Sequence, residues 1–317
     1  MKLSVLDQSP IPEGQTNADA LANTLDLARL ADDLGYHRYW LAEHHGGPML
    51  AGNAPEVLIP SVAAATTRIR VGSGGVMLPH YSPFKVAEAF TILAAMYPGR
   101  IDLGLGRASG TDPRTTFALQ RDRSRAMPDD FPNQMAELLG YLDGTLPEEH
   151  PFASLSEWLP EQRPDVWLLG SSPQSRIWAT ESELRYAFAD FINPDGAAFA
   201  KPADAVAVWV VCAETEEEAQ RLASSSRMTF SLLRRGRLIK VPPPEKALRY
   251  LEQYGGSGAG RRGVIGNPDQ VRAGVEEVAQ AYGANEVIAV TITFDHAARR
   301  RSYELLAEAF ALVPAGA

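Results

Sequence analysis

The 317-residue sequence has a single cysteine, Cys212, and only six histidines. One cysteine excludes an internal disulfide, and its place in the apolar run AVAVWVVCA favours a buried, unreactive thiol. The histidines lack the spacing of a helical zinc site, and the adjacent His44 and His45 would point to opposite faces of a strand. The sequence therefore predicts neither a disulfide nor a metal site.

Basic residues and long apolar runs are also scarce. The net charge is −9, and the short cluster Arg234, Arg235 and Arg237 is typical of a solvated helix face, not of a nucleic-acid-binding stripe. No run approaches the length of a membrane span, and the N-terminal MKLSVLDQSPIPEG contains no apolar region of the export type. We therefore expect a cytoplasmic protein that binds neither nucleic acid nor membrane.

The sequence does contain a regular alternation of apolar strands and helical patterns. Helices are expected after Thr16, whose spacing to Asp19 is that of a capping box, and after Ser82, which precedes a proline. Eight strands separated mostly by helices favour a closed (β/α)8 TIM barrel of the α/β class over an open doubly wound sheet. The predicted strands cover residues 3–7, 39–43, 70–77, 101–106, 165–169, 185–189, 206–212 and 287–292.

We assign residues 1–317 to one barrel domain. Two segments, 143–164 and 190–204, break the alternation because they are rich in Pro, Gly, Asp and Glu. Loops of this length are uncommon inside a compact domain unless they have a function of their own. We therefore interpret both segments as insertions or lids over the carboxyl-terminal face of the barrel.

The residues that follow the predicted strands are unusually polar or rich in glycine. In a barrel the active site lies at the carboxyl-terminal ends of the strands, so these residues would surround one mouth. We therefore take the candidate functional residues from positions 7–9, 43–45, 74–75, 107–110, 170–172 and 295–296.

Two of these segments are typical of a phosphate site. Arg107 follows a strand, and its guanidinium can donate paired hydrogen bonds to a phosphate. In LLGSSPQS, a strand runs through Gly170 into a helix start, where backbone N–H groups and the Ser171 and Ser172 hydroxyls can bind an anion. Taken alone, the second segment is more typical of a plain serine N-cap. Together the two favour a phosphate-binding site.

Glycine clusters follow two of the strands. The glycines of DLGLGRASG, residues 102–110, do not have the spacing of the dinucleotide fingerprint, so we favour a turn that presents Arg107. Gly74 and Gly75 lie at a predicted strand end, where a flat ligand ring could approach the backbone closely. A β-bulge is the alternative interpretation, and it is compatible with the first.

These motifs, in their order along the chain, resemble those of one family. The succession WLAEHH, VGSGGVMLP, YPGRIDLGLGRASGTD, WLLGSS and GNPDQV is similar to that of the luciferase-like flavin-dependent monooxygenases, including bacterial single-chain oxidoreductases, some of them found in biosynthetic pathways. The resemblance covers nearly the whole chain and is most specific in the first 110 residues. It implies a (β/α)8 barrel that binds reduced FMN, with the phosphate near Arg107, Gly170, Ser171 and Ser172.

The resemblance also implies a catalytic residue. His44 matches the active-site histidine of the family, so it would face the flavin while His45 supports it from the other side, and its ordinary pKa of about 6.5 would allow proton transfer near neutrality. A histidine that is hydrogen-bonded to the backbone and does no chemistry is the alternative.

Further implied features concern the flavin ring and the substrate pocket. Many family members have a non-proline cis peptide bond after the third strand, which maps to Gly74–Gly75 beneath the flavin ring. We assign Ser9, His80 and Phe191 to the substrate pocket. Phe191 occupies a position where many relatives carry a small residue or histidine, so the pocket floor departs from the family pattern.

The function that the resemblance implies is an FMN-dependent monooxygenase. Reduced FMN would react with O₂ to give a C4a-peroxyflavin that oxygenates a small organic substrate, and a separate flavin reductase would supply FMNH₂ because no nucleotide fold accompanies the barrel. One alternative is hydride transfer by a deazaflavin on the same barrel, and another is a non-catalytic flavin-binding relative. The sequence does not indicate the substrate. A homodimer is expected because dimers are common in the family.

Overall fold

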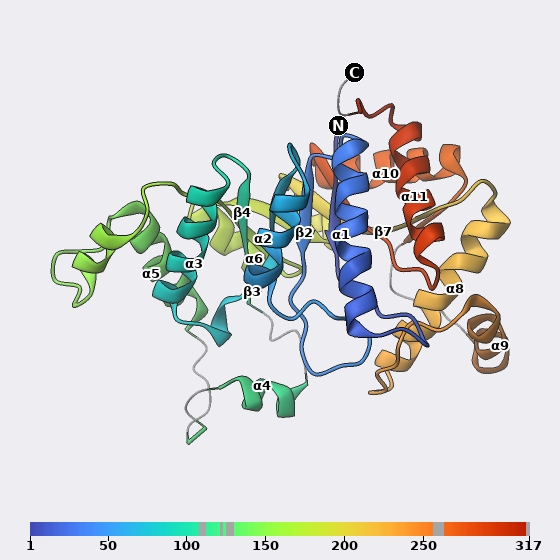
Figure 1. Ribbon diagram of the computed structural model, residues 1–317, viewed down its shortest axis with the longest axis horizontal. Coiled ribbons are helices and arrows are strands. Elements are labelled where there is room, and N and C mark those ends of the chain that lie inside the picture. The colour runs from blue at the N-terminus through green and yellow to red at the C-terminus, as the bar shows by residue number, and fades with distance from the viewer. Residues whose placement is uncertain (108–111, 121–122, 125–129, 256–262, 315–317) are drawn as a thin grey trace.

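The computed structural model describes residues 1–107, 112–120, 123–124, 130–255 and 263–314 (Figure 1). Eight parallel strands hydrogen-bond in the order β1–β2–β3–β4–β5–β6–β7–β9, and β9 pairs back with β1. This closure confirms the predicted barrel. The strands of the closed ring are β1 (Lys2–Asp7), β2 (Arg38–Leu41), β3 (Arg70–Met77), β4 (Ile101–Gly106), β5 (Asp165–Gly170), β6 (Arg185–Ala189), β7 (Ala205–Cys212) and β9 (Glu286–Val290). A further short strand, β8 (Gly263–Gly266), pairs with β7 outside the ring.

Helices surround the barrel and connect its strands (Figure 1). Thr16 confirms the predicted capping box, because its hydroxyl accepts a hydrogen bond from the Asp19 N–H at 3.2 Å. The helices are α1 (Asn17–Asp33), α2 (Pro55–Ala65), α3 (Pro83–Met96), α4 (Pro113–Leu119), α5 (Phe131–Asp143), α6 (Pro173–Glu181), α7 (Ala197–Ala200), α8 (Glu216–Leu233), α9 (Pro244–Tyr254), α10 (Pro268–Tyr282) and α11 (His296–Ala309), with the 3-10 helices η1 (Leu78–His80) and η2 (Ala153–Trp158).

The two faces of the barrel strands have different roles in the core. Side chains alternate along a strand, so neighbours such as Tyr39 and Trp40 belong to separate apolar clusters. One cluster joins the strands to the surrounding helices, and the other lies within the barrel. The inner cluster combines large rings with small residues such as Ala187 and Ala207, which leave space near the carboxyl ends of the strands.

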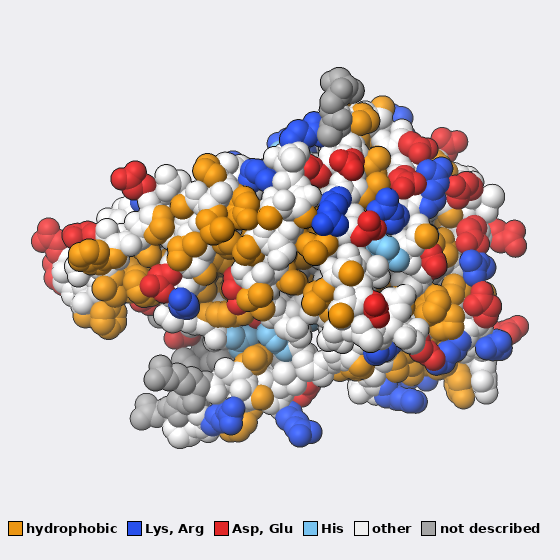
Figure 2. All heavy atoms as spheres, viewed as in Figure 1, with side chains coloured by type: hydrophobic (Ala, Val, Ile, Leu, Met, Phe, Trp, Pro, Cys, Tyr) orange, Lys and Arg blue, Asp and Glu red, His pale blue; other side chains and the backbone are white. Residues whose placement is uncertain are grey.

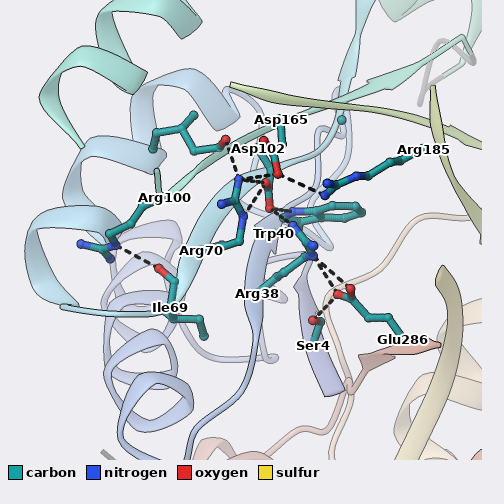
Figure 3. A network of polar contacts seen from close by, with 12 residues as sticks. Ser4, Arg38, Trp40, Ile69, Arg70, Arg100, Asp102, Asp165, Arg185 and Glu286 are labelled. Carbon is teal, nitrogen blue, oxygen red and sulfur yellow. Dashed lines mark hydrogen bonds and ion pairs between the residues drawn. The ribbon is translucent and has the colours of Figure 1, made fainter. Parts of the chain in front are cut away.

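A network of buried charges closes the opposite end of the barrel (Figure 3). Arg38, at the start of β2, pairs with Asp102 of β4 at 2.7 Å and with Glu286 of β9 at 2.9 Å. Arg70, at the start of β3, binds the second Asp102 oxygen at 2.6 Å and Asp165 at 3.0 Å. These groups come from the amino-terminal ends of separate strands, so the network ties the strands together at the barrel floor.

The two segments that break the alternation lie at different ends of the barrel. Residues 143–164 connect α5 to the first residue of β5, so they lie at the amino-terminal ends of the strands. Residues 190–204 follow the last residue of β6 and therefore begin at the mouth. The expectation that both segments cover the carboxyl-terminal face is therefore wrong for residues 143–164, and the description of residues 190–204 as an insertion or lid stays a prediction. Among the described helices, none is long and apolar enough to cross a membrane.

Candidate active site

A cavity of about 430 Å³ lies at the carboxyl ends of the strands. This volume is within the range of small-molecule and cofactor sites. The structure brings together around it the residues that the sequence assigned to catalysis and cofactor binding, and their roles stay predictions. The lining includes His44, Gly74, Gly75, Arg107, Gly170, Ser171, Ser172 and Phe191. Residues 108–110 of the predicted turn lie outside the described residues.

One end of this cavity combines the Arg107 cation with the start of helix α6. Ser172 is the N-cap of α6, and its hydroxyl accepts a hydrogen bond from the Ser175 N–H. The Arg107 guanidinium lies 5.3 Å from the centre of the Trp178 ring, which belongs to the same helix. Arg107 therefore packs against α6, and it lines the same cavity as Ser171 and Ser172 at the start of that helix.

The inner end of the cavity is apolar and rigidly supported. Leu6, Trp40 and Ile288 line it from separate strands. The Trp40 indole N–H donates to Asp102 at 2.9 Å, and its ring meets that of Trp167 edge-on with centroids 5.3 Å apart. The charged floor network of Figure 3 thus also orients an aromatic wall of the cavity.

The Gly74–Gly75 peptide bond is cis, as the resemblance implied. The pairing of β3 with β4 shifts between Gly74 and Val76, which confirms the β-bulge interpretation. A Cβ atom on Gly74 would lie 2.6 Å from the Leu6 side chain, and one on Gly75 would lie 2.7 Å from the Gly104 oxygen. Close packing of the strands therefore requires both glycines, and their smooth backbone borders the cavity.

His44 lies in the cavity wall, immediately after β2. Its backbone N–H donates to the Gly52 oxygen at 2.9 Å, whereas Nδ1 of its ring is buried and has no hydrogen-bond partner. The ring retains partial solvent access, yet enough protein surrounds it that burial, assisted by His45, lowers its pKa to about 4. The expected pKa near 6.5 is therefore wrong, and His44 is neutral at physiological pH.

His45 faces a different partner from His44, as expected for adjacent residues at a strand end. Its Nε2 lies 2.7 Å from Glu43 Oε1. Glu43 is fully buried and also accepts hydrogen bonds from the Met77 N–H at 2.9 Å and from the Tyr81 hydroxyl at 3.1 Å. Burial and the Glu43 charge raise the pKa of Tyr81, so this donor stays protonated. Glu43 thus organises the loop that presents His44.

Two residues assigned to the substrate pocket lie elsewhere. The Ser9 hydroxyl is 2.9 Å from the Thr24 hydroxyl, and the Ser9 backbone has a φ of 50° that turns the chain after β1. The described lining contains the neighbouring Gln8 in place of Ser9. His80 packs edge-on against His45, with ring centroids 6.0 Å apart, and is likewise absent from that described lining. Ser9 and His80 therefore lie outside the described lining of the two cavities, and their assignment to the substrate pocket stays a prediction.

A second cavity of about 470 Å³ adjoins the first. Both are lined by Gln8, His44, Phe191 and Ile192, so these four residues form the junction between them. Gln8 lies in the candidate segment 7–9 that the sequence indicated, but the sequence analysis assigned the pocket position to its neighbour Ser9. The other walls of the second cavity include Met49, Leu50, Trp209, Phe230, Leu233 and Leu238.

Residues 234–243 and the loops after β1 and β2 cover the carboxyl-terminal mouth of the barrel. Val241 donates to the Ile11 oxygen at 2.9 Å and accepts from the Glu13 N–H at 2.8 Å, which ties residues 234–243 to the loop after β1. The loop after β2 is anchored by the Ile11 N–H, which donates to Met49. Within the described part of the chain, no three His, Cys, Asp or Glu side chains are grouped to hold a metal ion.

Comparison with known proteins points to one family over most of the chain. Residues 1–286 match the family described as luciferase-like monooxygenase. A luciferase-like monooxygenase of Escherichia coli (strain K12) is 41% identical over 95% of this chain and 95% of its own length. An N-acetyl-S-alkylcysteine monooxygenase of Bacillus subtilis (strain 168) is 36% identical over 98% of each chain.

Solved structures share the same architecture. The apo structure of MsnO8 superposes with a TM-score of 0.90 at 40% identity and covers 99% of each chain. The FMN complex of the oxygenating constituent of 3,6-diketocamphane monooxygenase from Pseudomonas putida, a type II Baeyer–Villiger monooxygenase, has a TM-score of 0.74 at 20% identity over 99% of each chain. An F420-dependent secondary alcohol dehydrogenase has a TM-score of 0.68 at 13% identity over 96% of this chain and 98% of its own. The last two show likeness of fold only.

Proposed function

The chain belongs to the luciferase-like monooxygenase family and is an oxidoreductase, and from this premise we propose that it uses reduced FMN and O₂ to oxygenate a small organic substrate. In this proposal a separate flavin reductase supplies the reduced FMN, because the described residues form the barrel and its connections without a second nucleotide-binding unit. The observation that carries the proposal is the meeting of Arg107, the start of α6 and the unpartnered His44 Nδ1 around one cavity.

The residues of the first cavity fit FMN. Arg107 and the Ser171 and Ser172 hydroxyls at the start of α6 provide the charge and the donors that a phosphate needs. The smooth backbone of Gly74–Gly75 and the apolar end around Trp40 suit a flat ring. When bound, the reduced flavin supplies the electrons that activate O₂.

The chain's own residues control water and protons at this site. Phe191 and Ile192 present apolar side chains to both cavities at their junction, and the buried Phe191 ring limits the water that reaches the reacting atoms. His44 is neutral at physiological pH, so its ring offers one donor and one acceptor at the same place. Nδ1, which has no protein partner, is the atom that can bond to a bound ligand or hold a proton.

Anaerobic titration with photoreduced FMN, and separately with reduced F420, tests the cofactor. We expect reduced FMN to bind to one site per chain and at least about tenfold more tightly than reduced F420. A preference for F420 would support the deazaflavin reaction instead. Failure to bind either reduced cofactor would contradict the proposed function.

The two-component arrangement is tested with the same preparation. Purified protein with FMN and NADPH should oxidise NADPH no faster than a protein-free mixture, and an added flavin reductase should start the supply of reduced FMN. Rapid NADPH oxidation by the purified protein alone would overturn this part of the proposal.

We also propose that two copies of the chain associate through α2 and α3. Figure 2 shows hydrophobic side chains gathered over this part of the surface. Val57, Ile92 and Met96 are 65%, 50% and 58% exposed, respectively. An exposed apolar face of this kind is typical of a self-complementary dimer interface.

Light scattering coupled to size-exclusion chromatography tests the dimer. The wild-type chain should have the mass of a dimer, and Ile92→Lys should shift it to a monomer. Val313→Lys replaces a residue that is 66% exposed elsewhere on the surface and should have no such effect. A monomeric wild-type chain would refute the association.

A further inference from the structure

The second cavity is a site with its own chemistry. We propose that it is the substrate site and that it selects an uncharged aromatic molecule, an inference that rests on the proposed flavin site in the first cavity. The junction of the two cavities, at Gln8, His44, Phe191 and Ile192, then places the substrate next to the flavin. Three features of the second cavity support this assignment: its aromatic wall, the charge of its lining residues and one buried donor.

Three aromatic side chains form a continuous wall of the second cavity. The ring centroids of Phe191 and Trp209 are 5.3 Å apart at an interplanar angle of 68°, and those of Trp209 and Phe230 are 4.8 Å apart at 47°. All three line the cavity, and Phe191 also lines the first one. Rings attract other rings in stacked and edge-on arrangements beyond the effect of buried area. A flat ligand can therefore contact the wall from the junction outwards.

The side chains that line the second cavity, as distinct from the neighbouring Arg234, Arg235 and Arg237, disfavour an anionic ligand. Neither lysine nor arginine is found among its described lining residues, and the single carboxylate there belongs to Asp112. This carboxylate caps α4, because it accepts hydrogen bonds from the Arg114 and Thr115 N–H groups at 2.9 and 3.2 Å. An anionic ligand would lose its hydration without gaining an opposite charge.

A buried donor also lacks a protein partner at this site. Trp209 lines the cavity, and its Nε1 is buried without a hydrogen-bond acceptor. Leaving such a group unpaired costs free energy, which a hydroxyl or carbonyl oxygen of the ligand would recover. Gln8, at the junction, adds a side chain that can both donate and accept. An aromatic ring that carries one neutral oxygen group combines these requirements.

Calorimetric titration of the FMN-saturated protein with three compounds that share a fused bicyclic ten-carbon skeleton tests the proposal. The probes are 2-naphthol, 2-naphthoate and decahydro-2-naphthol, which separate the contributions of charge and aromaticity. We expect 2-naphthol to bind about tenfold more tightly than each of the others, the difference that one or two ring contacts provide. Equal or tighter binding of 2-naphthoate or decahydro-2-naphthol would overturn the proposal.

Variants of the wall locate the binding site. Phe230→Leu should reduce 2-naphthol affinity severalfold and leave decahydro-2-naphthol unchanged. Phe152→Leu, a matched change at a 52% exposed ring outside the two cavities, should alter neither. Leu233→Arg, at a partly exposed wall position, should raise the affinity for 2-naphthoate relative to 2-naphthol. Unchanged selectivity in both wall variants would place the binding elsewhere and refute the assignment.

Titration of the same proteins with photoreduced FMN separates this inference from the proposed function. Phe230→Leu and Leu233→Arg should bind reduced FMN as the wild type does, because neither residue lines the first cavity. Wild-type protein that binds reduced FMN but shows no selectivity for 2-naphthol would refute the substrate class alone. Lost flavin binding in the wild type would refute the flavin site on which the inference rests.

Discussion

His44 shows how strongly the surroundings of one residue change its chemistry. The sequence places a histidine at a strand end, and an ordinary pKa would make it a proton carrier near neutrality. In the structure its ring is surrounded by protein, and burial lowers the pKa to about 4. We therefore expect a neutral imidazole to act at the site throughout the physiological range.

The lowered pKa of His44 predicts a specific pH dependence of stability. Below pH 6.5 the unfolded chain binds a proton at this residue, whereas the folded chain does so only near pH 4. Folding stability is therefore lost as pH falls from about 6.5 to about 4, by at most about 3 kcal/mol from this residue. His44→Gln should lose less stability than the wild type over this range, as measured by urea unfolding at a series of pH values.

A comparison of the two proteins isolates this residue, because other histidines titrate in both. Burial also lowers the pKa of His296 and of His37, so each contributes an acid-sensitive slope of the same sign. If the stability of the wild type and of His44→Gln changed in parallel between pH 4 and 6.5, that result would contradict the conclusion that burial keeps His44 neutral.

At the residue scale, sequence reasoning found the groups at the cavity but not all of their directions. His44, Arg107 and the glycines were located because they follow strands that converge on one mouth. The turn after β1 directs the Ser9 hydroxyl to Thr24 and leaves Gln8 at the cavity. Such directions depend on backbone angles in irregular segments, which strand periodicity does not determine.

The start of α6 is the element on which the predicted phosphate site depends. Ser172→Ala should destabilise the protein by about 1 kcal/mol through loss of the cap, and it should also weaken reduced FMN binding. Thr215→Ala removes the equivalent cap from α8, where the Thr215 hydroxyl accepts a hydrogen bond from the Glu218 N–H at 3.2 Å. It should cost similar stability and leave FMN binding unchanged, as measured by urea unfolding and flavin titration.

Two outcomes would contradict this account of α6. If both variants weaken FMN binding equally, the effect arises from general destabilisation. If neither does, the helix start has no contact with the flavin phosphate.

At the element scale, strands and helices with strong patterns were predicted well. The bounds of β3, β4 and β6 coincide with the predicted ranges, because apolar runs there end at glycines, prolines or charged residues. β8 was missed because it has only four residues, GVIG, and pairs with the end of β7 outside the closed ring. So short a segment becomes a strand through its partner and not through its own propensity.

The whole barrel depends on the charged network at its floor. Asp102 accepts hydrogen bonds from Arg38, Arg70 and Trp40 and is fully buried. Asp102→Ala would leave these donors without their acceptor, so we expect a loss of about 3–5 kcal/mol in urea unfolding. The same variant should weaken reduced FMN binding, because Trp40 lines the first cavity.

An exposed ion pair provides the matched control for this change. Asp143 pairs with Arg163 at 2.6 Å, and both side chains are largely exposed. Asp143→Ala should therefore change stability by less than about 1 kcal/mol. Similar losses in the two variants would contradict the role assigned to the floor network.

At the scale of the molecule, the alternation of strands and helices was sufficient to predict the barrel, but not how its ends are closed. The pairing of the charged residues at the strand starts depends on strand register, which the alternation of strands and helices does not determine. The floor network and the cover over the mouth both join segments that are far apart in the chain. Contacts of this kind follow from the closed barrel and could not be identified before it was known.

The central claim is that the first cavity binds FMN through its phosphate, and the most direct test compares photoreduced FMN with photoreduced riboflavin in anaerobic titrations. The wild type should bind FMN at least about tenfold more tightly than riboflavin, which lacks the phosphate. Arg107→Ala should remove most of that preference, and Arg163→Ala, at the far end of the barrel, should retain it. Equal affinities of the wild type for the two flavins, or an unchanged preference in Arg107→Ala, would contradict the account.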